Sequence, residues 1–266
     1  MSFPGLTESA PGACIVNMIR QLLLLLSTLN LLQAGETLRL LSYNLHHGEG
    51  TDGKVDLPRI ADYIKAQTPD VVFLQEIDRN CTRSGKVDQA AELGRLTGLT
   101  PVFAKFMNFQ GGEYGQAILT KFPVQHSRTV ELPAGSEPRS SAVATVKAPW
   151  GPLTVANVHF YETEAQRLAQ AQALVAALDH GKSEAILMGD FNSEPGDKVI
   201  SWLSSLYTFP DKQGELKATW PSDNPKENID HIFYRLEGGW KITEYRVLEE
   251  KVISDHRPLL CVMQKN

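Results

Sequence analysis

The chain is poor in cysteine, and the cysteines it has are widely spaced. Its 266 residues include three, Cys14, Cys81 and Cys261. Residues so far apart do not form a zinc site, whose ligands come in closely spaced pairs. An exported protein could join Cys81 to Cys261, but Cys261 lies in the apolar segment PLLCVM, which is typical of a core strand. We therefore expect two unlinked thiols.

The chain also lacks a cluster of basic residues. It has 26 Lys and Arg against 31 Asp and Glu, which gives a formal net charge of -5. A protein that holds long nucleic acid normally presents a basic track that neutralises phosphates. Nucleic acid is therefore a less favoured partner, although net charge does not exclude a local basic pocket.

Internal repeats, low-complexity tracts and linkers are absent from residues 36–266. The hydrophobic content of 42% and the charged content of 21% are ordinary for a soluble globular domain. We predict a single domain over residues 35–266, with a core of useful size.

A leucine-rich run near the N-terminus is too short for a comfortable membrane span. Met18-Ile-Arg20 leads into QLLLLLSTLNLL, and Ala34 follows shortly. This order of basic, apolar and small residues is typical of a secretory signal peptide. We predict cleavage after Ala34, export to the periplasm or the medium, and no stable membrane span afterwards. Residues 1–34 are then an extension and signal, with translation starting at Met18 as one explanation for residues 1–17. An uncleaved anchor and a short buried helix are the alternatives.

Strand-like and helix-like segments alternate along the rest of the chain. Asp56 and Pro58 indicate the start of a helix, Gly98 and Gly181 indicate helix ends, and Pro149-Trp-Gly-Pro152 indicates a hairpin. Continuous apolar strands favour two packed sheets with helices outside, since regular βαβ spacing is missing. The expected strands are 38–43, 71–74, 117–119, 141–147, 153–159, 185–188, 231–235, 240–248 and 258–263, and the expected helices are 57–67, 88–97, 162–179 and 197–204.

Short polar or ionisable side chains stand at the ends of these apolar strands. Each one alone is typical of a turn, a helix cap or a solvated position. Together they favour a site, because strand ends of a rigid sheet can converge. The seven places are Asn44, Glu76, Tyr114 with Gln116, Asn157 with His159, Asp190 with Asn192, Asp230 with His231, and Asp255 with His256.

The residue types at these positions suit phosphate chemistry. Glu76 is a ligand for a hard metal ion, with Asn44 as a neutral oxygen neighbour, and Mg²⁺ prefers one or two carboxylates plus water or phosphate oxygens. An Asp-His dipeptide and the Asp190-x-Asn192 pair can activate water and stabilise an anionic phosphorus centre. The two-residue spacing aims Asp190 and Asn192 toward the same side while strand geometry persists.

The ordered motifs SYNLHHG, LQEID, YGQAILT, NVHF, GDFN, IDHIF and SDHRP resemble the endonuclease/exonuclease/phosphatase superfamily of DNase I-like hydrolases. The match runs from about residue 38 to 263. It implies an α/β fold, a four-layer α/β/β/α sandwich of two packed mixed sheets with outer helices. It also implies hydrolysis of a phosphate ester that depends on Mg²⁺, with Mn²⁺ as the alternative.

The resemblance assigns roles residue by residue. The implied catalytic residues are His159, Asp190, Asn192, Asp230, Asp255 and His256. The implied metal ligands are Asn44, Glu76 and Asp255, and the implied substrate contacts are Tyr114, Gln116 and Arg139. Gln116 departs from the family, in which asparagine is common, and Arg139 is either an anion clamp or a surface charge.

These assignments predict in-line attack by water on a phosphate ester. The favoured substrate is a small or lipid-linked phosphodiester. An extracellular DNase I-like nuclease is the first alternative, and a non-catalytic phosphate-binding module is the second. The roles of the two histidines, the choice between monoester and diester, and the oligomeric state stay open.

Overall fold

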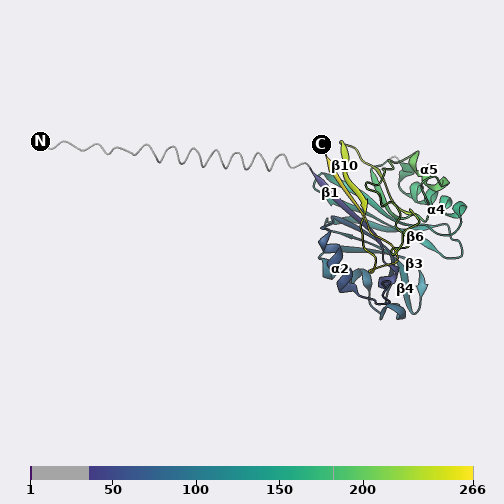
Figure 1. Ribbon diagram of the computed structural model, residues 1–266. Helices are drawn as coiled ribbons and strands as arrows, with labels where there is room; N and C mark the ends of the chain where they lie inside the picture. Colours follow the sequence, from purple (N-terminus) through teal and green to yellow (C-terminus); the bar gives the residue numbers. More distant parts are fainter. Residues whose placement is uncertain (2–35, 182, 266) are drawn as a thin grey trace. The chain divides into compact units, whose positions relative to one another are not determined.

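The computed structural model describes Met1, residues 36–181 and residues 183–265 (Figure 1). The chain separates into two units, Met1–Glu36 and Thr37–Asn266, and the fold below is that of the second. The signal peptide and its cleavage after Ala34 fall outside the described residues and stay predictions. Among the described helices, none combines the length and apolar character that a membrane crossing requires.

Two mixed sheets make up the second unit. The six-stranded sheet has the order β10-β11-β1-β2-β4-β3, and the five-stranded sheet has the order β5-β6-β7-β8-β9. Strands β1 and β2 are parallel, as are β7 and β8, and the other neighbours are antiparallel. The first sheet contains β1 (Thr37–Asn44), β2 (Val71–Arg79), β3 (Thr100–Phe109), β4 (Gly112–Thr120), β10 (Trp240–Val247) and β11 (Leu259–Lys265), and the second contains β5 (Val124–Leu132), β6 (Arg139–Ala148), β7 (Gly151–His159), β8 (Ala185–Asp190) and β9 (Asp230–Arg235).

The sheets pack face to face, and helices cover their outer faces. Alternation along β1 sends Leu40 into the core between the sheets and Leu41 toward α2 (Leu57–Ala66) and α3 (Gln89–Thr97). In the second sheet, Leu187 of β8 packs with α4 (Glu164–Ala177) and α5 (Lys198–Ser204). Figure 1 shows α2 on one side of the strands and α4 and α5 on the other. The predicted four-layer sandwich is confirmed.

Local capping signals explain where the helices begin and end. The Asp56 carboxylate accepts a hydrogen bond from Arg59 N at 3.0 Å, as predicted, and Gly98 ends α3 with a left-handed φ of 75°. Helix α4 is shorter than predicted. Thr163 forms a capping box with Gln166, so the helix begins at Glu164, and a 3₁₀ turn replaces its expected last residues.

Two strands, β3 and β5, were not expected from the sequence. Both lie at sheet edges. Strand β5 is exposed along most of its length, with burial confined to Val130 and Leu132. An edge strand that buries little carries no strong apolar pattern, and this explains the omission.

Cys81 and Cys261 are both buried and unlinked, which confirms the expected free thiols. The Cys81 thiol donates to Phe109 O at 3.1 Å and to Glu113 O at 3.3 Å. Cys261 belongs to the core between the sheets. Both thiols therefore contribute to packing and lie in separate parts of the fold.

Candidate active site

Strand register brings the predicted site residues together. His159 at the end of β7 pairs with Asp190 of β8, and Asp190 pairs with Asp230 of β9. Three acid-base side chains thus stand on adjacent strands. Ser254 Oγ donates to Asn44 O at 2.6 Å, which fastens the turn that carries Asp255 and His256 to the end of β1.

These strand ends surround a cavity of about 430 Å³. Its walls come from both sheets and from the loops that follow them, as expected for a site built on converging strand ends. The cavity is lined by Glu76, Tyr114, Glu137, Arg139, His159, Tyr161, Asp190, Asn192, Trp220, Glu227, Ile229, Asp255 and His256.

Strained backbone aims two of the lining residues. Glu76 has a φ of 56° and sits where the register between β2 and β4 shifts, between Leu74 and Ile77. Asn192 has a φ of 47° just after β8. Such conformations are unfavourable for residues other than glycine, and bulges re-aim side chains beside active sites. The fold therefore holds both side chains at the cavity against a local conformational penalty.

Gly189 makes the close packing beneath this site feasible. Its φ is 151°, and a Cβ atom there would lie 2.0 Å from Val158 O. Any side chain would force β7 and β8 apart. The Gly-Asp-Phe-Asn sequence thus combines a glycine that allows close strands with two polar groups at the cavity.

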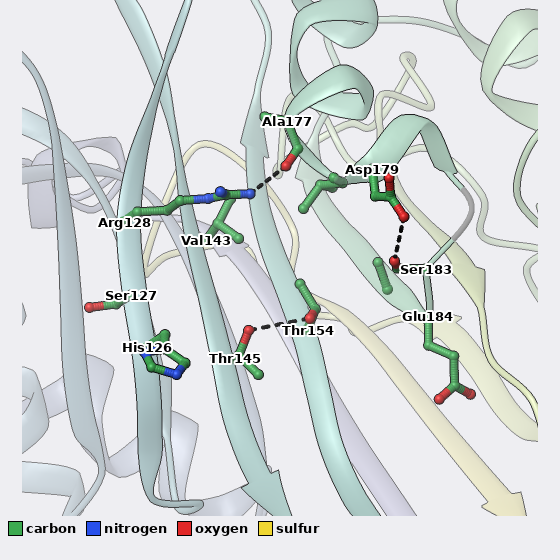
Figure 2. Close-up of a pocket in the computed structure, with 12 residues that line it drawn as sticks. His126, Ser127, Arg128, Val143, Thr145, Thr154, Ala177, Asp179, Ser183 and Glu184 are labelled. Atoms are coloured by element: carbon green, nitrogen blue, oxygen red, sulfur yellow. Dashed lines mark hydrogen bonds between the residues drawn. The ribbon is translucent and has the colours of Figure 1, made fainter.

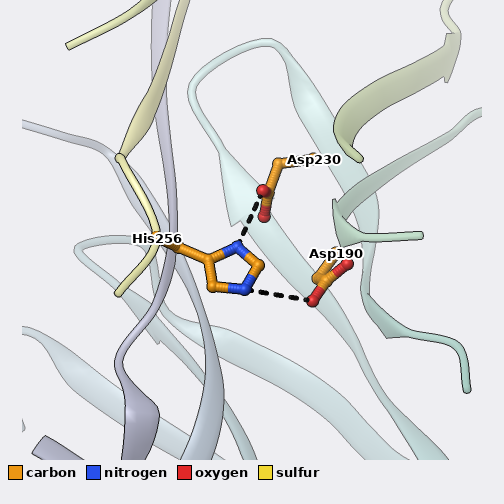
Figure 3. A group of neighbouring side chains, drawn as sticks. All are labelled: Asp190, Asp230 and His256. Atoms are coloured by element: carbon orange, nitrogen blue, oxygen red, sulfur yellow. Dashed lines mark hydrogen bonds and ion pairs between the residues drawn. The ribbon is translucent and has the colours of Figure 1, made fainter. Parts of the chain in front are cut away.

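His256 and Asp230 form a buried hydrogen-bonded pair. His256 Nδ1 donates to Asp230 Oδ2 at 3.0 Å, and its Nε2 lies 3.8 Å from Asp190 Oδ2 (Figure 3). Burial alone would lower the pKa of His256, but the carboxylates of Asp230, Asp190 and Asp255 outweigh it and raise the pKa to about 10. His256 is therefore an imidazolium at neutral pH.

The pKa of Asp190 is also raised, but by burial and by a neighbouring charge of the same sign. Burial and the neighbouring Asp230 charge raise the pKa of its carboxyl to about 7. Hydrogen bonds from Asn192 N at 2.8 Å and Asn44 Nδ2 at 3.2 Å orient the carboxylate. A carboxylate with a pKa near neutrality is suited to taking a proton from water.

His159 is neutral in the same environment. Burial, followed by the charges of Arg139 and His256, keeps the pKa of His159 well below its usual value. Its Nε2 lies 3.7 Å from Asp190 Oδ2 and 4.0 Å from Glu76 Oε1. The ring also packs edge-on against Phe106. His159 can thus form hydrogen bonds at the wall of the cavity without carrying a charge.

The three predicted metal ligands differ in how they face the cavity. Glu76 and Asp255 line it. Asn44 is fully buried and points its amide nitrogen at Glu76 Oε1, 3.1 Å away, while its Oδ1 accepts from His46 N. In this arrangement Asn44 orients Glu76 through an N–H group. Its oxygen is turned toward backbone instead of the cavity.

Glu76 and Asp255 are carboxylates that line the same cavity, and carboxylates are the side chains that Mg²⁺ takes as ligands. The cation takes one or two carboxylates and keeps its remaining positions for water and phosphate oxygens, and the open cavity leaves room for these. A second acidic group consists of Asp190, Asp230 and His256, whose ligand atoms all lie within 4.8 Å of one another (Figure 3). That group is buried, and its imidazolium donates to Asp230, so its proton would have to leave before a metal bound.

Two of the three predicted substrate contacts reach the cavity. Tyr114 and Arg139 line it, whereas Gln116 does not. Gln116 is fully buried, and its Nε2 donates to Ser140 O at 2.6 Å and to Asn157 O at 3.2 Å. These bonds run from the first sheet to the second. The structure therefore places Gln116 in a polar bridge between the sheets.

Comparison with known proteins agrees with the geometry. The sequence profile of the Endonuclease/Exonuclease/phosphatase family matches residues 41–256. The chain belongs to this family. It is accordingly a phosphoric ester hydrolase, and the resemblance inferred from the motifs is confirmed.

Several solved structures share the fold. A family protein from Bacteroides vulgatus aligns with a TM-score of 0.71 at 19% identity, covering 87% of this chain and 100% of that one. A Bacteroides thetaiotaomicron mannosyl-6-phosphatase gives 0.69 at 20%, covering 85% and 99%. The human Nocturnin catalytic domain with bound sulfate gives 0.66 at 21%, covering 86% and 95%. No curated protein matches the chain.

Several cavity residues of this family member were not expected from the sequence. They lie in loops or carry residue types with ordinary structural uses, so nothing local marked them. Trp220 is the clearest case, because its indole Nε1 donates to Asp255 Oδ2 at 3.2 Å and thereby orients a proposed metal ligand. The others are Glu137, Tyr161, Glu227 and Ile229.

A second cavity, of about 270 Å³, lies away from this site (Figure 2). It is formed by β5, β6, β7 and the end of α4, and its polar groups largely satisfy one another. Arg128 donates to Ala177 O, the hydroxyls of Thr145 and Thr154 lie 3.3 Å apart, and Ser183 bonds to Asp179. Five of the six predicted catalytic residues, all but Asp230, line the other cavity, and none lines this one.

Replacing Asp190 with asparagine is expected to increase the stability of the metal-free hydrolase above pH 7. The folded-state pKa of Asp190, about 7, exceeds the ordinary value of 3.8. Stability from the protonated carboxyl is therefore fully present below about pH 4 and lost as the pH rises through 7. Asparagine does not titrate, so the advantage of the variant should grow between these values and then level off. Thermal denaturation in EDTA across this pH range measures the effect.

Asp62→Asn is the matched control, because the Asp62 side chain is 75% exposed. Its difference from wild type should stay small and flat with pH. A parallel fall in the stability of wild type and Asp190→Asn between pH 4 and 7 would contradict the raised pKa of Asp190.

Proposed function

We propose that this hydrolase is an exported, Mg²⁺-dependent phosphodiesterase that acts on a small or lipid-linked substrate. The observation that carries the proposal is that the carboxylates of Glu76 and Asp255 line the same cavity as Asp190 and His256, with Asp230 bonded to His256 behind them. The absence of a basic run in the sequence supports a compact substrate over long nucleic acid. Export rests on the N-terminal sequence alone.

In the proposed mechanism Asp190 is the general base for the attacking water. Its raised pKa suits that task, and Asn192 and Asn44 hold its two carboxylate oxygens in place. His256 Nε2 lies 3.8 Å from Asp190 Oδ2, so both groups act on the same side of the reacting phosphate. Its imidazolium, held by Asp230, stabilises the negative charge that develops on a non-bridging phosphate oxygen.

His159 is better suited to orienting than to donating a proton to the leaving group. A neutral imidazole is a weak acid, and the pKa of His159 is held well below its usual value by burial. This supports a hydrogen-bonding role beside Glu76 and Asp190. When bound at Glu76 and Asp255, Mg²⁺ would supply charge neutralisation for the phosphate oxygens and the leaving group.

Arg139 is the proposed anion contact on the substrate side. Its side chain is only 2% exposed, lies over the rings of Tyr161 and Phe106, and lines the cavity. Its NH1 donates to Glu137 and Pro138 O, while its buried Nε has no hydrogen-bond partner among the described residues. A buried guanidinium with an unused donor beside the catalytic groups favours a phosphate or carboxylate of the substrate.

The test of the proposed function is hydrolysis of three substrates by the wild-type protein. We would compare bis-p-nitrophenyl phosphate, p-nitrophenyl phosphate and plasmid DNA, each with Mg²⁺, with Mn²⁺ and with EDTA. EDTA-sensitive cleavage of the diester alone is the expected result. Faster cleavage of the monoester would indicate a phosphatase, plasmid nicking would indicate the nuclease alternative, and equal turnover in EDTA would contradict metal dependence.

Replacing Arg139 with methionine is expected to raise KM about tenfold with a smaller change in kcat. Methionine keeps much of the packing between the two rings but removes the charge, so binding of the substrate anion weakens. Steady-state kinetics on the preferred substrate measures this. Arg95→Met is the control, because Arg95 is an exposed helix residue paired with Glu92. Equal KM values for the two variants would contradict the anion contact.

A further inference from the structure

A buried lysine lies behind the active site and has no place in the mechanism above. Lys212 is only 6% exposed. Its ammonium donates to Lys217 O at 3.0 Å and to Asn228 Oδ1. Buried lysines are rare, because removing an ammonium from water is unfavourable. Because burial of this ammonium is unfavourable, its contacts indicate what it holds in place.

The two acceptors of Lys212 stand at the two ends of one active-site loop. Between Lys217 and Asn228 the chain forms a narrow hairpin in which Thr219 and Trp220 bond to Glu227. Trp220 and Glu227 both line the catalytic cavity. One ammonium thus closes the base of the hairpin that presents them.

Further hydrogen bonds connect the end of this hairpin to the strands that carry the catalytic residues. Asn228 N donates to Glu194 Oε1 at 3.0 Å, which links the hairpin to the turn after β8. Phe191 N bonds to Ile229 O at 2.9 Å in the same region. Asn192 and Asp230 are the chain neighbours of Phe191 and Ile229, so they flank this hydrogen bond.

We propose that Lys212 is a positioning residue for phosphate-ester hydrolysis. Its ammonium closes the base of the 217–228 hairpin, which Asn228 links to the turn after β8, and so holds Trp220 against Asp255 and keeps Asp230 in line with His256. This inference rests on the proposed function, since it names a residue that supports that same site.

The cavity around Lys212 also contains a neutral histidine. It has a volume of about 360 Å³ and is also lined by His231. His231 Nε2 donates to Ser193 O at 2.8 Å, and burial, followed by the charge of Lys212, lowers the pKa of His231 to about 3, so the ring is neutral. The charge of Lys212 is therefore not opposed by a second buried cation at this cavity.

The charge of Lys212 also reaches the catalytic pair. Burial lowers the pKa of Lys212 to about 7, and the positive charge of Lys217 adds to this effect. The negative charges of Asp230 and Glu194 oppose it. In return, Lys212 is among the groups that lower the pKa of Asp230. The other charged neighbour at this cavity is Asp211. Lys212 therefore helps to keep Asp230 an anion for His256.

The test compares Lys212→Met with Lys217→Met, because the exposed Lys217 lines the same cavity and its hydrogen bond with Lys212 uses only the backbone carbonyl, which the substitution retains. We expect Lys212→Met to lower kcat roughly tenfold with little change in KM, as for other residues that orient catalytic groups. Its melting temperature should be equal to or above that of wild type, since methionine removes a buried charge. Lys217→Met should match wild type in all three quantities.

Lys212→Arg supplies a second readout. Arginine stays protonated, so the ratio of its kcat to that of wild type should rise as the pH increases above 7. Hydrogen exchange of residues 217–230, measured for all variants, should increase in Lys212→Met alone. If Lys212→Met does not fold, Asn228→Leu breaks the same fastening from the acceptor side.

Several outcomes would overturn the positioning role. One is a kcat for Lys212→Met equal to that of Lys217→Met. Another is a melting temperature of Lys212→Met that falls together with its kcat, which would indicate a purely structural lysine. A wild-type protein without any hydrolysis would instead reject the proposed function. Hydrogen exchange would then still test whether Lys212 holds the hairpin in place. Equal exchange in Lys212→Met and Lys217→Met would reject that role.

Discussion

Glu76→Gln is expected to lower the hydrolysis of phosphate esters about 10³-fold, because a bound cation supplies several kcal/mol of charge stabilisation. Glutamine keeps the size of the side chain and its contact with Asn44 but removes the charge that holds the cation. The strained φ of Glu76, 56°, is retained by either residue, so the fold should be unaffected. Turnover of the preferred substrate and Mg²⁺ titration by calorimetry measure the two effects.

The matched control for this prediction is Glu131→Gln, at an exposed position of the edge strand β5. It should bind Mg²⁺ and turn over substrate as wild type does. Loss of turnover in Glu76→Gln with unchanged Mg²⁺ affinity would place the cation elsewhere, and the buried group of Asp190, Asp230 and His256 would then be the next candidate. Wild-type turnover by Glu76→Gln would reject the metal assignment.

His256→Ala is expected to lower kcat by about 10³-fold or more, because it removes the charged donor nearest to the general base. The imidazolium lies 3.8 Å from Asp190 and is held by Asp230. Without it, the developing charge on the phosphate is unopposed on that side, and Asp230 is left as a buried, unpaired carboxylate. Single-turnover kinetics on the preferred substrate separates this loss from effects on binding.

The partner variant Asp230→Asn sharpens the prediction. Because His256 and Asp230 act as one hydrogen-bonded unit, the double variant should be no slower than His256→Ala alone. His126→Ala, at an exposed histidine of β5, is the control and should keep wild-type kcat. Fully multiplicative losses in the double variant would show that the two residues act separately, and near-wild-type turnover by His256→Ala would reject its assignment.

Local sequence determined the elements that bury much apolar surface or carry a distinctive cap. The hairpin of β6 and β7, the apolar β8, and helices α2 and α3 with their Asp caps all follow from patterns within a few residues. Edge strands β3 and β5 do not, because their formation depends on a neighbouring strand and not on their own apolar content. The same limit applies to α4, whose exact end depends on the turn that follows it.

The sequence alone also predicted which residue types gather at the cavity, through short polar residues at the ends of apolar strands. The sequence could not determine in which direction each of these side chains points or how deeply it is buried. Gln116 and Tyr114 stand two residues apart on β4, yet Tyr114 lines the cavity while Gln116 bonds to backbone between the sheets. Asn44 was expected to offer a metal its oxygen, and the fold turns its N–H toward Glu76.

Tertiary structure alone decided the protonation states and the support of the site. The pKa values of Asp190 and His256 depart from ordinary values because three strands and a loop bury both groups beside Asp230, whose negative charge raises both, and no local pattern reveals this. Trp220 and Lys212 acquire their contacts only when a loop folds back over strand ends far away in the sequence. Patterning along a chain specifies which faces are buried, whereas distances between groups on different strands follow from how those strands pack.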